Sequence, residues 1–157
     1  MSESIAIRRL RFTLIIHRIV QILLCFLLIY MALHFQHLFA VKGTPHIFRN
    51  SLIATLLLQL ALFFPLRRFA GNEARRELTA ALAQTSAEQQ KVLRQQRLFS
   101  DTIKGAVFLG FVGFIWLAPA ATFVLGTSFF CFIVTIITYL QCFNFTLQRG
   151  FAELTSA

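Results

Sequence analysis

Four long apolar segments dominate this sequence and constrain what it can fold into. They cover residues 19–41, 47–66, 105–125 and 128–147. Each holds about 20 residues, and a helix of that length rises roughly 30 Å, which matches the hydrocarbon core of a bilayer. We therefore predict an all-α integral membrane protein with four transmembrane helices, arranged as two hairpins that a cytoplasmic helical segment joins.

The composition agrees with this class. Of the 157 residues, 57% are hydrophobic and only 13% are charged, and the mean hydropathy is +0.72. A soluble domain of this length needs a more polar surface. The 19 phenylalanines suit helices that face lipid. We expect residues 1–157 to form a single membrane domain.

Basic residues flank the apolar segments, and they predict how the chain is oriented. Lysine and arginine are frequent before the first segment and between the second and third, whereas the two other loops carry few. Under the positive-inside rule both termini are cytoplasmic, and we expect the protein in a bacterial inner (plasma) membrane. The residues assigned to this lipid head-group and orientation role are Arg8, Arg9, Arg11, Arg67, Arg68 and Arg149.

The net charge of +9 raises the question of a nucleic-acid partner. The basic residues flank apolar segments instead of gathering into one stripe, so anionic lipid head groups are the expected counterparts. The predicted partners are therefore membrane lipids, together with other membrane subunits or further copies of the chain, and no nucleic acid.

Residues 71–101 are the only part with soluble character. They are rich in good helix formers, and they predict a helix over residues 73–83, a break at 84–86 and a second helix from Ala87. Asn72 is a candidate cap for the first helix. The apolar face of this segment suits either the membrane surface or a partner helix, and the alternative is a plain link between the hairpins.

Two stretches echo each other, QLALFFPLRRFA at residues 59–70 and QCFNFTLQRGFA at 141–152. Gln, Phe, Arg, Phe and Ala recur at the same spacings, and Gly-Thr pairs at 43–44 and 126–127 are expected at the two outer turns. The echo indicates two like hairpins related by a pseudo-two-fold axis along the membrane normal. The alternative is that aromatic residues and arginine simply collect at the membrane interface.

Uncharged polar residues lie within the apolar segments. Amides there hydrogen-bond across helices, or they line a polar path. Gln59 and Gln141 are expected at similar depth toward the cytoplasmic side. The residues assigned to this interhelical role are Gln21, Gln59, Gln141 and Asn144.

Small residues share one face of the third apolar segment. Such a face lets a neighbouring backbone approach closely, so we assign it to helix packing. Pro119 either kinks this helix or marks its last turn. The packing residues are Ala106, Gly110, Gly113 and Ala121.

Three histidines are weak candidates for a metal site. His34 and His37 lie one helical turn apart, and His46 follows in the outer loop. No carboxylate or cysteine lies near them, so we assign no metal ligand. A haem needs axial histidines on facing helices, which the other apolar segments do not offer. No cofactor is predicted.

The remaining residues do not compose a catalytic site. No Asp or Glu lies in the four spans, which disfavours proton-driven transport, and no nucleophile–base set or phosphate-binding loop is present. We predict a non-enzymatic membrane protein that acts through helix association, as an accessory or assembly subunit or a self-associating scaffold. The alternatives are a small transporter or channel with a polar path near Gln59 and Gln141, and a metal- or haem-binding redox subunit.

Overall fold

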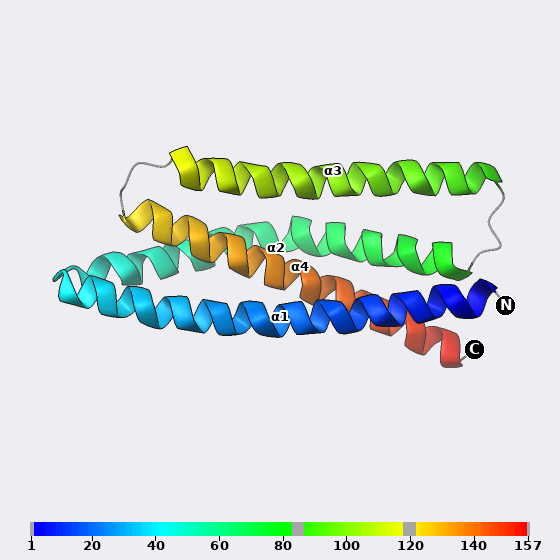
Figure 1. The fold of residues 1–157 in the computed structure, drawn as a ribbon, viewed down its shortest axis with the longest axis horizontal. Coiled ribbons are helices and arrows are strands. Elements are labelled where there is room, and N and C mark those ends of the chain that lie inside the picture. The colour runs from blue at the N-terminus through cyan, green and yellow to red at the C-terminus, as the bar shows by residue number, and fades with distance from the viewer. Residues whose placement is uncertain (1, 83–86, 118–121, 157) are drawn as a thin grey trace.

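The structure, a computed structural model, consists of four long helices (Figure 1). It describes residues 2–82, 87–117 and 122–156. The all-α class predicted from the sequence is confirmed. The helices are α1 (Ser2–Val41), α2 (Pro45–Leu82), α3 (Ala87–Leu117) and α4 (Thr122–Ser156).

Three of these helices are long and apolar enough to cross a membrane. They are α1, α2 and α4, each of which is longer than a span requires and contains an apolar window of 18 residues. Within its described residues α3 is less apolar. The fold therefore supports a membrane protein with three candidate spans, and α3 is a weaker fourth.

The second helix does not end where the sequence predicted. α2 continues without a break from the apolar segment through Gly71 and Asn72 to Leu82, so the predicted cap at Asn72 is wrong. Gly71 packs against α4, where a Cβ would lie 3.6 Å from Thr146 Oγ1. This contact and the good helix formers that follow favour a continuous helix. The predicted break at 84–86 lies outside the described residues.

The turn between α1 and α2 confirms the first predicted Gly-Thr reversal. Gly43 has φ +67°, a conformation that favours glycine. Thr44 N donates to Phe39 O over 2.9 Å, which satisfies a carbonyl at the end of α1. Pro45 then occupies the first position of α2, where its missing N–H costs nothing.

The second predicted Gly-Thr reversal is wrong. α4 begins at Thr122 and continues as helix through Gly126 and Thr127. The segment continues as helix because it packs along α2, where a Cβ at Gly126 would lie in ordinary van der Waals contact, 3.6 Å from Ser51 Oγ. Gly126 therefore lies within a helix–helix contact instead of a turn. The connection at 118–121, with Pro119 and Ala121, lies outside the described residues.

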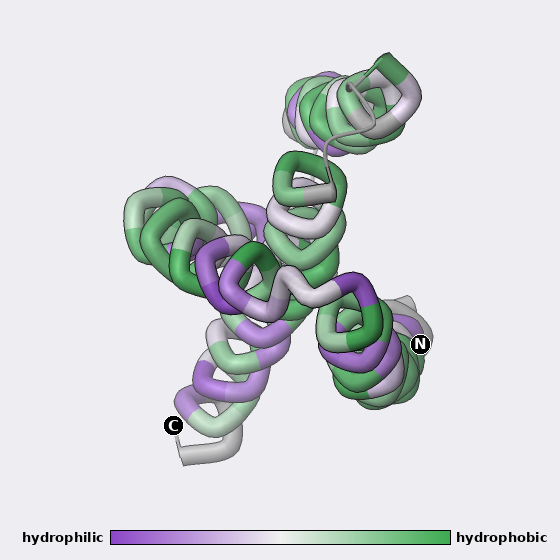
Figure 2. The backbone as a smooth tube through the Cα atoms, turned by 90° about the vertical axis from the view of Figure 1, so that its left-hand side faces the viewer, coloured by the Kyte–Doolittle hydropathy of each residue, from purple (hydrophilic) through white to green (hydrophobic). Residues whose placement is uncertain are grey.

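The central helix is α4, which packs most extensively on α2 and also contacts α1 (Figures 1 and 2). α2 and α4 run in the same direction, because contacts pair Ser51 with Gly126 near their starts and Leu78 with Gly150 near their ends. The buried core lies toward the ends of these helices and includes α1. Its members are Leu10, Leu14, Ala70, Ala74, Phe143 and Leu147.

The two predicted hairpins are packed differently. α1 lies against both α2 and α4, whereas α3 makes only sparse contacts with α4 and α2. Figure 2 shows α3 set apart from the other three helices, viewed along the bundle. The chain is therefore a three-helix core with a peripheral fourth helix.

Candidate functional site: an interhelical polar network

Polar side chains of α2 face α4 along the parallel contact. The Ser51 hydroxyl donates to Phe123 O over 3.3 Å, and the Thr55 hydroxyl reaches Thr127 O over 3.4 Å. Both hydroxyls also donate to their own helix, four residues back. These shared bonds join two helix backbones without any charged group.

Gln59 continues this contact. Its amide nitrogen donates to Thr138 Oγ1 over 3.0 Å, and its amide oxygen accepts from Thr135 Oγ1 over 3.2 Å. The residue is only 9% exposed. Both ends of the Gln59 amide are therefore hydrogen-bonded to α4, so this residue links the two helices.

Gln141 faces a different neighbour. Its amide oxygen accepts a hydrogen bond from Gln21 Nε2, so this pair joins α4 to α1. Gln141 lies one turn beyond Thr138, the residue that Gln59 contacts. The two amides therefore lie at neighbouring levels, but they serve separate interfaces.

Asn144 is the fourth amide, and it is buried at 5% exposure. Neither of its polar side-chain atoms has a well-formed hydrogen bond within the described part of the chain, and the same holds for His17 Nδ1. The two side chains are nevertheless neighbours. The His17 ring packs edge-on against Phe143, with centroids 5.1 Å apart.

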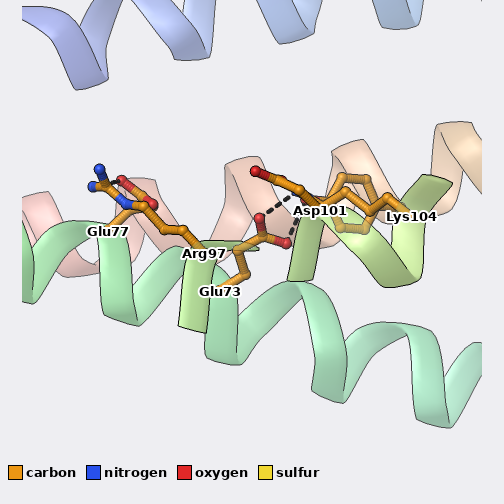
Figure 3. A network of polar contacts seen from close by, with 6 residues as sticks. Glu73, Glu77, Arg97, Asp101 and Lys104 are labelled. Carbon is orange, nitrogen blue, oxygen red and sulfur yellow. Dashed lines mark hydrogen bonds and ion pairs between the residues drawn. The ribbon is translucent and has the colours of Figure 1, made fainter. Parts of the chain in front are cut away.

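A second polar network, centred on Glu73 and Lys104, joins α2, α3 and α4 (Figure 3). Glu73 of α2 accepts from Lys104 Nζ of α3, and it accepts from the Tyr139 hydroxyl of α4 over 2.7 Å. Lys104 also lies 3.3 Å from Asp101 and 5.5 Å from the Tyr139 ring centroid.

A second ion pair lies one turn further along. Arg97 Nη2 of α3 is 2.5 Å from Glu77 Oε2 of α2. These ion pairs were not predicted from the sequence, because residues 71–101 were interpreted as separate helices outside the bundle. A signal was present: Glu73 and Glu77 are four residues apart on one helix face, and Arg97 and Lys104 are seven apart on another.

Aromatic contacts supply the rest of the attachment of α3. Phe108 and Phe111 lie against Phe132 of α4, with centroids 5.7 and 5.0 Å apart. At about 100° per residue, the face of α3 that carries Ala106, Gly110 and Gly113 points away from these contacts. We call these three residues the small-residue face.

No described atom of another helix lies near the small-residue face. A Cβ added at Gly110 or Gly113 would meet nothing within 4 Å. The predicted close approach of a neighbouring backbone is therefore not made by a described residue of the same chain.

The histidines proposed as weak metal ligands are not brought together. His34, His37 and His46 are all exposed, and the His34 ring stacks on Tyr30 with centroids 6.2 Å apart. Among the residues the structure describes, no three His, Cys, Asp or Glu side chains form a group that could hold a metal ion. Cys25, Cys131 and Cys142 are free thiols.

The arginines assigned to orientation are exposed, and they lie on α1, α2 and α4. The start of α1 and the end of α4 share one end of the bundle (Figure 1), which we call the basic end. Exposure at that end leaves the guanidinium groups accessible to solvent or head groups. These residues are Arg8, Arg9, Arg11, Arg67, Arg68 and Arg149.

Comparison with protein-family models, curated proteins and solved structures found no match to this chain. Its function must therefore be inferred from its own residues. Chemically, the polar network holds helices together: amides and hydroxyls join α4 to α1 and α2, and carboxylates join α3 to α2.

Proposed function

We propose that this chain is a non-enzymatic integral membrane protein that works through helix association. It acts as an accessory or assembly subunit, or as a self-associating scaffold, of a membrane complex. Its basic end faces the cytoplasm, as expected from the distribution of arginine and lysine, and its location is the bacterial inner membrane.

The observation that carries the proposal is the outward small-residue face of α3. Helices in lipid associate mainly by packing, and glycine allows backbones to approach closely. Here Gly110 and Gly113 point away from their own bundle and have open space around them. An α3 from a second copy, or a helix of another subunit, fits such a face.

A second observation supports the same proposal. α3 is attached to its own bundle by few contacts, yet large apolar residues at its far end are widely exposed, with Trp116 at 86% and Leu117 at 82%. Packing against another helix would cover part of this surface. Gln21, Gln59 and Gln141, by contrast, hydrogen-bond within the chain, which favours association over a polar path between Gln59 and Gln141.

Crosslinking in native membranes tests the proposal. We expect the unmodified chain to yield crosslinked species, and the double change Gly110→Leu with Gly113→Leu to reduce their yield several-fold. Gly105→Leu is the matched control: it also adds a side chain in open space, but it lies on another face of α3. Recovery of monomer alone from native membranes, with no partner captured, would contradict the proposal.

A further inference from the structure

A large open groove lies between α2 and α4. It has a volume of about 1210 Å³ and is lined by residues of these two helices alone. Small-molecule pockets typically measure roughly 300–1,000 Å³, so the groove suits a larger ligand. We call it the basic groove.

The two echoed stretches form the walls of the basic groove. Phe63 and Arg67 of α2 line one wall, and Phe145 and Arg149, which hold the same positions in the second stretch, line the other. The two walls belong to one groove because α2 and α4 run in parallel.

The parallel arrangement gives the groove two chemically distinct ends. On both helices the aromatic residues precede the arginines in the direction of the basic end. Phe63 and Phe64 therefore lie toward the middle of α2, with Arg67, Arg68 and Arg75 beyond them. An amphipathic ligand with an apolar tail and an anionic head matches this order.

The charge of the groove is strongly unbalanced. Four arginines line it, and Glu153 is its single lining carboxylate. Glu153 lies 3.4 Å from Arg149. Within the described part of the chain, no ion pair involves Arg67, Arg68 or Arg75. Three guanidinium groups are therefore available to an anion, and arginine binds phosphate through paired hydrogen bonds.

We propose that the basic groove binds an anionic phospholipid. Its phosphate lies among Arg67, Arg68 and Arg75, and its acyl chains lie against Phe63, Phe64 and Phe145. Basic pockets between membrane helices bind lipid head groups in this manner. The site is distinct from the small-residue face of α3, so the proposal stands independently of the proposed function.

The test uses the full chain in nanodiscs of phosphatidylcholine to which phosphatidylglycerol is added. The groove variant is Arg67→Gln with Arg68→Gln, at two residues that line the groove. Its control is Lys91→Gln with Arg94→Gln, which removes the same charge from exposed residues of α3. We expect the groove variant to lower the affinity for phosphatidylglycerol roughly tenfold and the control to change it less than twofold.

Two further measurements ask whether inorganic phosphate alone occupies the groove and whether the acyl chains of the lipid contribute to binding. Inorganic phosphate at millimolar concentration should not displace the lipid, and Phe145→Ser, at a residue that is 65% exposed, should weaken lipid binding while the helical content is unchanged. Equal losses in the groove variant and the α3 control would overturn the proposal. Displacement by inorganic phosphate, or equal binding of phosphatidylcholine, would overturn it as well.

Discussion

The amide of Gln59 on α2 donates to the hydroxyl of Thr138 on α4 over 3.0 Å, and this bond lies within the longest helix contact of the molecule. A second threonine one turn earlier completes the amide's hydrogen bonding. Hydrogen bonds between uncharged polar side chains in this way hold α4 against its neighbouring helices.

Replacing Gln59 by Leu should therefore destabilise the α2–α4 contact modestly. Hydrogen bonds between membrane helices contribute about 0.6 kcal/mol on average and about 1.7 at most, so the loss of two bonds should cost about 1–2 kcal/mol. The free energy of unfolding in mixed detergent micelles measures this. Leu60→Ala, at a residue that is 68% exposed, is the control. A collapse of solute flux in liposomes without a change in stability would instead favour a transporter.

Replacing Gly150 or Gly105 by leucine should have opposite effects on the free energy of unfolding. A Cβ at Gly150 would collide with Leu78 Cδ2, whereas one at Gly105 would meet nothing within 4 Å. We expect Gly150→Leu to lower the free energy of unfolding by about 1 kcal/mol, because the Leu78 side chain must rotate away and the added leucine crowds the contact. Gly105→Leu should leave it unchanged or raise it, because leucine is the better helix former. Equal effects of the two changes would show that α2 and α4 do not approach at Gly150.

The Glu73–Lys104 pair should hold α3 to the bundle. The Glu73 side chain is only 15% exposed, so Lys104→Gln leaves its carboxylate with Tyr139 alone and should cost about 1–3 kcal/mol. Hydrogen exchange of the α3 amides should accelerate. The control is Arg97→Gln, since the Arg97 side chain is 56% exposed and should contribute less than about 1 kcal/mol. Unchanged exchange in the Lys104 variant would contradict this role.

Asn144 should tolerate an apolar replacement. Its amide is buried and lacks well-formed hydrogen bonds within the described residues, so Asn144→Leu removes polar atoms that are costly to bury. We expect the thermal midpoint of unfolding to stay the same or rise. A large loss of stability would indicate that Asn144 has a bound partner, such as an ordered water between it and His17.

The orientation proposed for the chain can be measured with single cysteines in a variant that lacks the three native ones. A cysteine at Arg8 should be protected from a membrane-impermeant thiol reagent in intact cells, and a cysteine at Lys42 in the α1–α2 turn should react. Both positions are exposed in the structure. The reverse pattern would overturn the cytoplasmic placement of the basic end.

The sequence predicted the helical class and one of the two outer turns, and the reasons differ between the correct and incorrect parts. Gly43 could be recognised because a glycine beside Thr44 and Pro45 marks a turn by local chemistry alone. Gly126 precedes a threonine too, but its role depends on Ser51 of α2, which local chemistry does not specify. Glycine in a membrane helix serves turns and close contacts alike.

The polar network was predictable in part. The amides at Gln21, Gln59 and Gln141 stood out because apolar segments surround them, although their partners are set by the helix arrangement. Glu73 did not stand out, since it belongs to a stretch that reads as soluble. Its contact with Tyr139 arises only because α2 continues as one helix past the apolar segment and α4 lies beside it.

The parallel pairing of α2 with α4 also has a consequence for biosynthesis. The segments that form this contact are separated by more than 60 residues, so the ribosome releases α2 well before its partner exists. Until α4 is inserted, Ser51, Thr55 and Gln59 lie in the bilayer without their final partners, and α2 contacts only α1 and α3. Insertion of α4 is therefore the step that completes the bundle. A chain that stalls before this step would leave these polar side chains of α2 without their partners and would be exposed to quality-control proteases.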